Sequence, residues 1–204
     1  MIRRFLARQF ARPSGWVGRW WIGPWLNRIG RAMNRLALEQ LELRPGDDVL
    51  EVGFGGGELL GRILAATSGE VFAVDISAAM VERARRRFGG KERLHLHRAS
   101  AAGLPIADGA VDKACSVNAL YFWEDPAVPL RELARVLRPG GRLVLCFQSP
   151  EAVRAWPGHV HGFAAYEVEA IIGHMEQAGF GPPRVTHGSH ASVGDFVCLT
   201  SERT

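Results

Sequence analysis

The stretch VLEVGFGGG, from Val49 to Gly57, is an apolar run that passes directly into a glycine-rich turn and then into a helical segment, 58–66. A short apolar run bounded by a turn predicts a buried strand. Glycines in such a turn let the backbone approach a ligand at the carboxyl end of the first strand, where open α/β sheets bind cofactors. The stretch therefore predicts an α/β sheet with a nucleoside-cofactor site at its edge.

Strand-like and helical segments alternate along the rest of the chain. Strands are predicted at 48–53, 70–75, 94–97, 111–117 and 142–147, and helices at 58–66, 77–88 and 126–137. This alternation implies parallel βαβ units, with a turn at Arg138–Gly141 before the last of these strands. A helix near 165–178 and strands at 184–187 and 196–200, joined by a hairpin loop at 188–194, complete a doubly wound, mostly parallel seven-stranded α/β sheet with an antiparallel C-terminal hairpin.

The first 45 residues differ from the rest of the chain in charge and in tryptophan content. They hold nine Arg residues against Glu39 and Glu42, and helical periodicity predicts amphipathic helices over 2–10 and 24–41. We divide the chain into an N-terminal helical extension or lid, residues 1–45, and an α/β domain, residues 46–204. A basic segment attracts anionic partners, so weak membrane contact through the N-terminus is one interpretation, although a solvated helix face is the commoner one.

Export, membrane and metal signals are not apparent in this sequence. Polar residues interrupt the first apolar run too early for a signal peptide, and no window reaches the ~18 uninterrupted apolar residues of a membrane span. The three cysteines, Cys115, Cys146 and Cys198, lie in strand-like runs without CxxC spacing, which is typical of reduced core thiols. We expect a cytoplasmic protein without a metal.

Two carboxylates indicate which cofactor the glycine turn holds. A dinucleotide fingerprint requires a third glycine where Glu58 stands, and a P-loop requires a Gly-Lys-Ser/Thr sequence that the chain lacks. Glu51, beside the turn, instead suits the ammonium group of a methionine moiety. Asp75 ends the second predicted strand about 20 residues further on, where an acid accepts hydrogen bonds from ribose hydroxyls. Ile76 and Met80 would flank the adenine, although Met80 alone is more typical of a core residue.

With these elements on one chain, the sequence resembles the class I S-adenosylmethionine-dependent methyltransferases, and in particular their type 11, small-molecule branch. Four blocks carry the resemblance: EVGFGGG at 51–57, VDIS at 74–77, GLPIADGAVD at 103–112 and RVLRPGG at 135–141. It extends over about residues 46–148. The resemblance implies a Rossmann-like methyltransferase domain at 46–204, with S-adenosylmethionine as cofactor and S-adenosylhomocysteine as product.

The resemblance also implies a set of cofactor-binding residues. Ser100 stands where the family often has an Asp that meets the adenine amino group, so its hydroxyl and the backbone N–H of Ala101 would contact the adenine ring instead. The backbone around Asn118 would face the methionine part. The predicted cofactor-binding residues are Glu51, Gly53, Gly55, Gly57, Asp75, Ile76, Met80, Ser100, Ala101 and Asn118.

Residues for the methyl acceptor are predicted from position alone. Methyl transfer from a sulfonium is a single displacement that needs no dedicated base, although a phenol or alcohol acceptor would profit from one. The catalytic candidates are His159, His161 and Tyr121. Tyr121 and Trp123 follow the fourth strand, where they line the acceptor site or cap the core. Together with the lid, the predicted substrate contacts are Trp20, Trp21, Tyr121, Trp123 and His159.

These observations predict a methyltransferase that acts on a small, apolar or aromatic acceptor. Two alternatives stay open: a membrane-associated lipid or quinone methyltransferase, and a protein that binds the cofactor without turnover. A nucleic-acid acceptor is disfavoured, because residues 118–121 read Asn-Ala-Leu-Tyr where base-modifying branches of the family carry an Asn-Pro-Pro-Tyr-like block. The sequence carries no signal for the oligomeric state.

Overall fold

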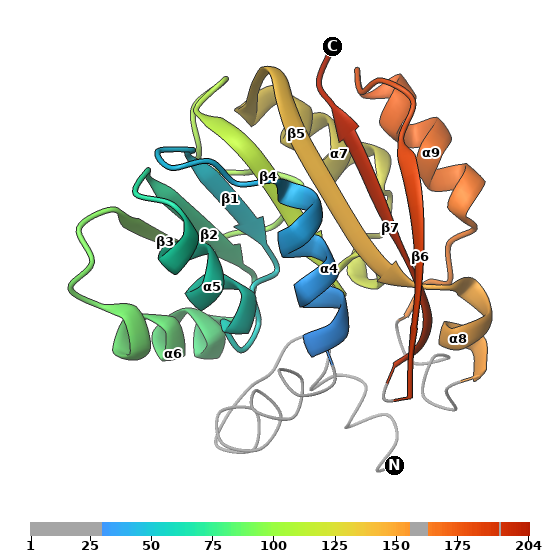
Figure 1. Ribbon diagram of the computed structural model, residues 1–204, viewed down its shortest axis with the longest axis horizontal. Coiled ribbons are helices and arrows are strands. Elements are labelled where there is room, and N and C mark those ends of the chain that lie inside the picture. The colour runs from blue at the N-terminus through green and yellow to red at the C-terminus, as the bar shows by residue number, and fades with distance from the viewer. Residues whose placement is uncertain (1–29, 156–162, 192) are drawn as a thin grey trace.

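The computed structural model describes residues 30–155, 163–191 and 193–204. The predicted helix at 2–10 and the start of the one at 24–41 lie outside these residues, as do Trp20, Trp21, His159 and His161. The described elements are α4 (Arg31–Leu41), β1 (Val49–Val52), α5 (Glu58–Ala66), β2 (Val71–Asp75), α6 (Ala78–Phe88), β3 (Leu94–Arg98), β4 (Val111–Val117), the 3-10 helix η2 (Leu120–Phe122), α7 (Ala127–Val136), β5 (Leu137–Gln148), α8 (Pro150–Ala155), α9 (Val168–Gln177), β6 (Arg184–His190) and β7 (Gly194–Glu202) (Figure 1).

The seven strands form one sheet in the order β3-β2-β1-β4-β5-β7-β6. The pairs from β3 to β5 are parallel, whereas β7 pairs antiparallel with both β5 and β6. The predicted fold class is confirmed. Because β1 has β2 on one side and β4 on the other, the chain crosses from one half of the sheet to the other beside β1. Open α/β sheets bind ligands at this switch point, outside the carboxyl ends of the strands.

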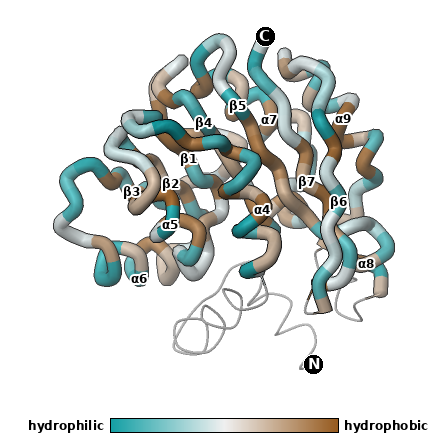
Figure 2. Tube along the Cα trace, viewed as in Figure 1, coloured by the Kyte–Doolittle hydropathy of each residue, from teal (hydrophilic) through white to brown (hydrophobic). Residues whose placement is uncertain are grey.

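Helices cover both faces of the sheet, with α4 and α5 in front of it and α7 behind it in Figure 1. Successive residues of a strand point to opposite faces. Val49 belongs to the core that includes residues of α4, α5 and α6, and Leu50 belongs to the core that includes residues of α7 and α9. Figure 2 shows the apolar residues concentrated along the central strands. The positions of β1 are therefore buried on both faces, as the continuous apolar run predicted.

Helix α4 is part of the layer that covers the sheet. Met33, Ala37 and Leu41 are fully buried on one side of it, in a core shared with Val144 and Cys198 of β5 and β7. These three residues are four positions apart, which places their side chains on one face of the helix. The end of the extension predicted at residues 1–45 is thus packed on the sheet. The predicted lid role of this extension stays a prediction.

Three details of the sequence prediction were wrong. The predicted turn at Arg138–Gly141 is part of β5, which follows α7 without a break. Between the pairs Val111↔Leu137 and Lys113↔Arg142, β5 advances by more residues than β4 does. The extra residues form a bulge in which Gly140 has a φ of +74°. The glycines therefore serve a bulge inside a strand, which local turn chemistry does not distinguish from a turn between elements.

The other two corrections concern the loop of the C-terminal hairpin and the helix α8. The loop predicted at 188–194 is shorter than expected, because β6 and β7 continue to His190 and Gly194. Gly188 pairs with Phe196, and a Cβ on Gly188 would lie 2.3 Å from the Phe196 ring. The glycine thus makes room for an aromatic ring rather than for a turn. The short helix α8, Pro150–Ala155, was not predicted.

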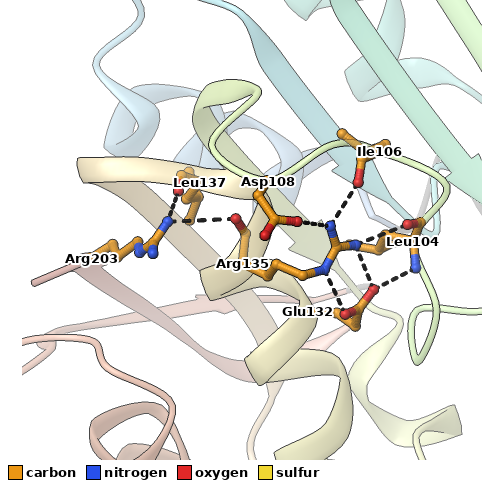
Figure 3. Close-up of polar contacts among 7 residues, drawn as sticks. All are labelled: Leu104, Ile106, Asp108, Glu132, Arg135, Leu137 and Arg203. Carbon is orange, nitrogen blue, oxygen red and sulfur yellow. Dashed lines mark hydrogen bonds and ion pairs between the residues drawn. The ribbon is translucent and has the colours of Figure 1, made fainter.

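The loop between β3 and β4 is held against α7 by the guanidinium group of Arg135, as Figure 3 shows. Its Nη1 donates to Ile106 O at 2.8 Å and to Asp108 Oδ1 at 2.6 Å, and its Nη2 donates to Leu104 O at 3.0 Å. Glu132 accepts from Arg135 Nη2 and from Leu104 N, both at 2.8 Å. Hydrogen bonds to Glu132 and Asp108 raise the pKa of Arg135. These bonds fix the loop between β3 and β4, in which Ser100 lies.

Replacing Arg135 by Ala is expected to lower the free energy of unfolding by about 1–2 kcal/mol. The change removes charge-assisted hydrogen bonds and leaves two half-buried carbonyls without their donor, while the exposure of Asp108 limits the electrostatic part of the loss. Urea unfolding measures the difference. Arg131→Ala, at an exposed position of the same helix, is the matched control, and equal stability of the two variants would show that the bonds of Arg135 are not stabilising.

Candidate cofactor site

The glycine turn after β1 combines one closely packed glycine with one that faces open space. Gly53 has a φ of +77° and Gly55 a φ of +49°, conformations that residues with a Cβ rarely adopt. A Cβ on Gly53 would lie 2.6 Å from the Cβ of Ala119, whereas a Cβ on Gly55 would meet nothing within 4 Å. Gly53 therefore allows close packing against the segment after β4, and Gly55 borders space that a ligand can enter.

Asp75, at the end of β2, is bonded to the glycine turn. Its Oδ2 accepts a hydrogen bond from Gly55 N and its Oδ1 accepts one from Ser77 N, both at 2.8 Å. The residue is only 8% exposed, and this burial raises its pKa while the two N–H groups oppose the rise. A carboxylate has about four lone-pair positions, so each oxygen keeps capacity for a further donor. Two adjacent hydroxyls, as on a ribose, match that capacity.

Glu51, on β1, carries a buried oxygen without a partner. The residue is 3% exposed, and its Oε2 has no hydrogen bond from any part of the chain that the structure describes. Burial, and then the charges of Asp75 and Glu58, raise its pKa to about 8. A buried acceptor left without a donor is costly. A cationic ligand that donates hydrogen bonds, such as an ammonium group, would satisfy this oxygen and compensate the carboxylate charge.

Glu58, the first residue of α5, links the glycine turn to α4. Its Oε2 accepts from Asn34 Nδ2 and its Oε1 from Arg62 Nε, both at 2.6 Å. Arg87 of α6 donates to the carbonyl oxygens of Gly56 and Gly57 at 3.3 and 3.4 Å. The sequence analysis did not predict the contacts of Asn34 and Arg87 with this turn. Both residues lie about 25–30 positions from their partners, and no local sequence pattern indicates such contacts. Their hydrogen bonds connect the glycine turn and the start of α5 to α4 and α6.

The residues predicted around the adenine differ in exposure. Ile76, directly after β2, is 38% exposed and offers an apolar surface beside Asp75. Met80, a residue of α6, is fully buried in the core between this helix and the sheet. This location agrees with the alternative interpretation of Met80 as a core residue. Ser100 is exposed, and its Oγ accepts from Ala102 N at 3.2 Å. The Ser100 hydroxyl is thus free to donate at the end of β3, next to half-buried Ala101.

The segment after β4 is close to the glycine turn. Asn118 directly follows the strand with a φ of +57°, and Ala119 abuts Gly53. The rings of Tyr121 and Trp123, predicted as acceptor contacts, are largely buried in the core. Phe122 and Phe163 are more exposed, and their ring centroids lie 4.8 Å apart. Sequence reasoning missed this pair, because Phe163 comes 41 positions after Phe122 and no shared motif connects them.

The described residues were compared with the side-chain sets that hold metal ions. Among residues 30–155, 163–191 and 193–204, no group of three or more His, Cys, Asp or Glu side chains is arranged to hold a metal ion. The thiols of Cys115, Cys146 and Cys198 are buried, and burial raises the pKa of Cys115. The predicted roles of Trp20, Trp21, His159 and His161 concern residues outside the described ranges and stay predictions.

Fold and site together define an α/β nucleoside-cofactor protein whose buried carboxylate acceptors suit an ammonium group and hydroxyls rather than a phosphate. The family model described as a methyltransferase domain matches residues 50–145. The uncharacterized methyltransferase YdaC of Bacillus subtilis strain 168 is 32% identical over 151 residues, which are 74% of this chain and 80% of that protein. The chain belongs to the class I S-adenosylmethionine-dependent methyltransferases, in their type 11 branch.

Other relatives match over a smaller share of their length. A 37.1 kDa protein of transposon TN4556 from Streptomyces fradiae is 40% identical over 117 residues, which are 56% of this chain and 34% of that protein. The demethylmenaquinone methyltransferase of Clavibacter sepedonicus is 38% identical over 106 residues, 52% of this chain and 43% of that protein. The chain thus spans a third to less than half of the length of these two relatives.

The fold has solved counterparts. The N-methyltransferase NodS of Bradyrhizobium japonicum WM9, solved with S-adenosyl-L-homocysteine, superposes with a TM-score of 0.75 at 17% identity, over 98% of this chain and 97% of that one. The cofactor of the family, S-adenosylmethionine, fits the residues present here. Its ammonium group would lie at Glu51 Oε2, its ribose hydroxyls at Asp75, and its chain along Gly55.

Cofactor binding is expected to strengthen as the pH rises from 6 to 8. Because the pKa of Glu51 lies near 8, the ligand-free protein holds this carboxyl group mainly protonated below that pH, and an ammonium group must displace the proton. The affinity for S-adenosylhomocysteine should therefore rise with pH, by up to about tenfold per unit, and level off near pH 8. Isothermal titration calorimetry measures this dependence.

The matched variant for this measurement is Glu51→Gln, which keeps the size of the side chain and removes its titration. We expect it to bind S-adenosylhomocysteine more weakly than the wild type at pH 8, with an affinity that is nearly constant between pH 6 and 8. A variant that keeps the pH dependence of the wild type would show that another group controls it.

Proposed function

We propose that the protein transfers the methyl group of S-adenosylmethionine to a small acceptor with an apolar or aromatic part. One observation carries the proposal: the buried Glu51 Oε2, unpartnered within the described chain, lies on the strand that leads into a glycine turn whose amide at Gly55 is bonded to Asp75. A carboxylate for an ammonium group and a carboxylate for a ribose, on adjacent strands, fit the two polar ends of the methionine–ribose part of this cofactor.

The residues of the chain would act by binding and alignment. When bound, the cofactor supplies the electrophilic methyl group, and the protein supplies orientation and exclusion of water. Glu51 would hold the amino-acid end of the cofactor and Asp75 its ribose. The half-exposed rings of Phe122 and Phe163 would offer apolar surface to an acceptor.

A quinone or another membrane-borne acceptor is the second candidate. The relative named demethylmenaquinone methyltransferase supports it, since a quinone ring has the apolar, aromatic character proposed here. None of the helices in the described ranges is both long and apolar enough to cross a membrane. We propose that such an acceptor would be reached by contact with a membrane surface through the basic N-terminal extension, residues 1–45. Co-sedimentation with anionic vesicles, lost on deletion of residues 1–25, would favour this candidate.

The proposed function is tested first on the cofactor. We expect wild-type protein to bind S-adenosylmethionine and S-adenosylhomocysteine with micromolar dissociation constants, and Asp75→Ala to weaken both by about 100-fold, because it removes the ribose acceptor and the anchor of the Gly55 amide. Asp195→Ala, at an exposed position of β7, is the control and should bind as the wild type does. Calorimetric titration provides all three values.

Turnover separates the enzyme from a protein that only binds the cofactor. A screen of phenols, quinols, amines and thiols, read as formation of S-adenosylhomocysteine, would identify the acceptor class. Cofactor binding without turnover on any of these classes, together with a site that the N-terminal residues close completely, would favour the non-catalytic alternative. No cofactor binding by the wild type would contradict the proposal.

A further inference from the structure

The hydroxyl of Tyr121 joins the ends of two strands beside the cofactor site. Its Oη donates a hydrogen bond to Asn118 Oδ1 at 2.9 Å and accepts one from Gln148 N at 2.5 Å. Asn118 follows β4, and Gln148 is the last residue of β5. The carbonyl oxygen of Tyr121 also accepts from Ala164 N at 3.0 Å. A single residue therefore links three segments that are far apart in the sequence.

Asn118, the residue that this hydroxyl holds, has an uncommon backbone conformation. Its φ is +57°, in the left-handed region that costs most non-glycine residues free energy and that Asn tolerates better than others. Its N–H donates to Cys146 O at 2.9 Å, and the bond from Tyr121 fixes its side chain. Asn118 is thus held in this conformation from both its backbone and its side chain.

The conformation of Asn118 determines where the next residue lies. The Cβ of Ala119 would be only 2.6 Å from a Cβ on Gly53, so the segment after β4 touches the glycine turn. Ser116 adds a second link between the two strands, since its buried hydroxyl donates to Val52 O at 2.9 Å. Any change in the backbone at Asn118 would therefore alter the spacing between this segment and the turn that faces the cofactor.

The surroundings of Tyr121 favour a neutral hydroxyl. The residue is 5% exposed, and burial raises the pKa of its phenol. Its ring packs at 6.1 Å from the Phe122 ring and at 6.0 Å from the Phe163 ring, centroid to centroid. A phenol that is buried, neutral and already bonded to two partners is poorly suited to take a proton from an acceptor.

We propose that Tyr121 is a positioning residue that sets the width of the cofactor site, by holding Asn118 in the left-handed conformation that brings Ala119 against Gly53. This inference rests on the proposed function, because it concerns the same site. It replaces the direct catalytic or substrate contact predicted for Tyr121 with an indirect role. The hydroxyl acts through Asn118, and the ring belongs to the packing of the core.

Tyr121→Phe is the variant that tests this role, since it keeps the ring and removes only the hydroxyl. We expect it to bind S-adenosylhomocysteine about tenfold more weakly than the wild type, because Asn118 and Gln148 N lose their shared partner and the segment after β4 is no longer fixed. Tyr166→Phe is the matched control. That hydroxyl donates to the carbonyl oxygen of Trp123, so its loss removes a bond of the same kind a few residues away and should leave the affinity within about twofold.

The same change in an Asn118→Gly background separates positioning from packing. Glycine adopts a positive φ without a side chain to hold, so Tyr121→Phe should reduce the affinity of Asn118→Gly by no more than about twofold. This double-mutant cycle reports the coupling of the two residues. Melting temperatures of all variants show whether each one is folded, and a merely structural role would lower the melting temperature without lowering the affinity.

The outcomes distinguish the inference from the function on which it rests. A tenfold loss for Tyr121→Phe that disappears in the Asn118→Gly background supports the positioning role. The inference is overturned if the wild type binds and Tyr121→Phe has the same affinity as the wild type. It is also overturned if Tyr121→Phe lowers the affinity equally in the wild-type and Asn118→Gly backgrounds. Either result leaves the proposed function intact. Wild-type protein that binds neither S-adenosylmethionine nor S-adenosylhomocysteine overturns both.

Discussion

The hydrogen bond from Gly55 N to Asp75 Oδ2, 2.8 Å long, fixes the geometry on which the rest of the site depends. It joins the glycine turn after β1 to the end of β2, with the backbone of Gly55 at a φ of +49°. With the turn held in this position, Gly53 lies against the segment after β4, and α5 begins at Glu58, the residue after Gly57. Removal of the bond would separate the ribose acceptor from the turn that borders the ligand.

The site contains an electrostatic conflict that a cofactor would relieve. Glu51 and Asp75 are both buried. Burial first, and then the charges of Asp75 and Glu58, raise the pKa of Glu51. The raised pKa means that ionised Glu51 opposes folding, a contribution that grows as the pH rises from the ordinary carboxyl value toward 8. A structural role would not favour such an arrangement. A ligand that brings positive charge and hydrogen-bond donors would explain it.

Much of the fold could be predicted from the sequence, because it depends on conformational preferences of short, local segments. The apolar run at 49–52 and the glycines at 53–57 carry their own conformational preferences, and Asp75 follows a strand at a distance that the βαβ unit determines. The bulge at Arg138–Gly141 and the packing of Gly188 against Phe196 were not readable. A glycine needed for a bulge or a close contact looks the same in sequence as one needed for a turn.

The site was readable to the extent that its residues belong to the strand ends. Glu51 is the penultimate residue of β1, Asp75 is the last residue of β2 and Asn118 directly follows β4. Their proximity therefore follows from the parallel topology. The contacts of Asn34 with Glu58, of Phe122 with Phe163 and of Tyr121 with Gln148 join segments whose spacing depends on tertiary packing. Tyr121 shows the difference most clearly, because its position after β4 was predicted while the direction of its hydroxyl, toward Asn118 and Gln148, was not.

A crystal structure of the protein with S-adenosylhomocysteine tests the central claim most directly. The account predicts that the ammonium group of the ligand donates to Glu51 Oε2, and that both ribose hydroxyls donate to Asp75 while Gly55 N and Ser77 N keep their bonds to it. A complex in which Glu51 Oε2 stays without a partner, or in which the ribose lies away from Asp75, would contradict the account.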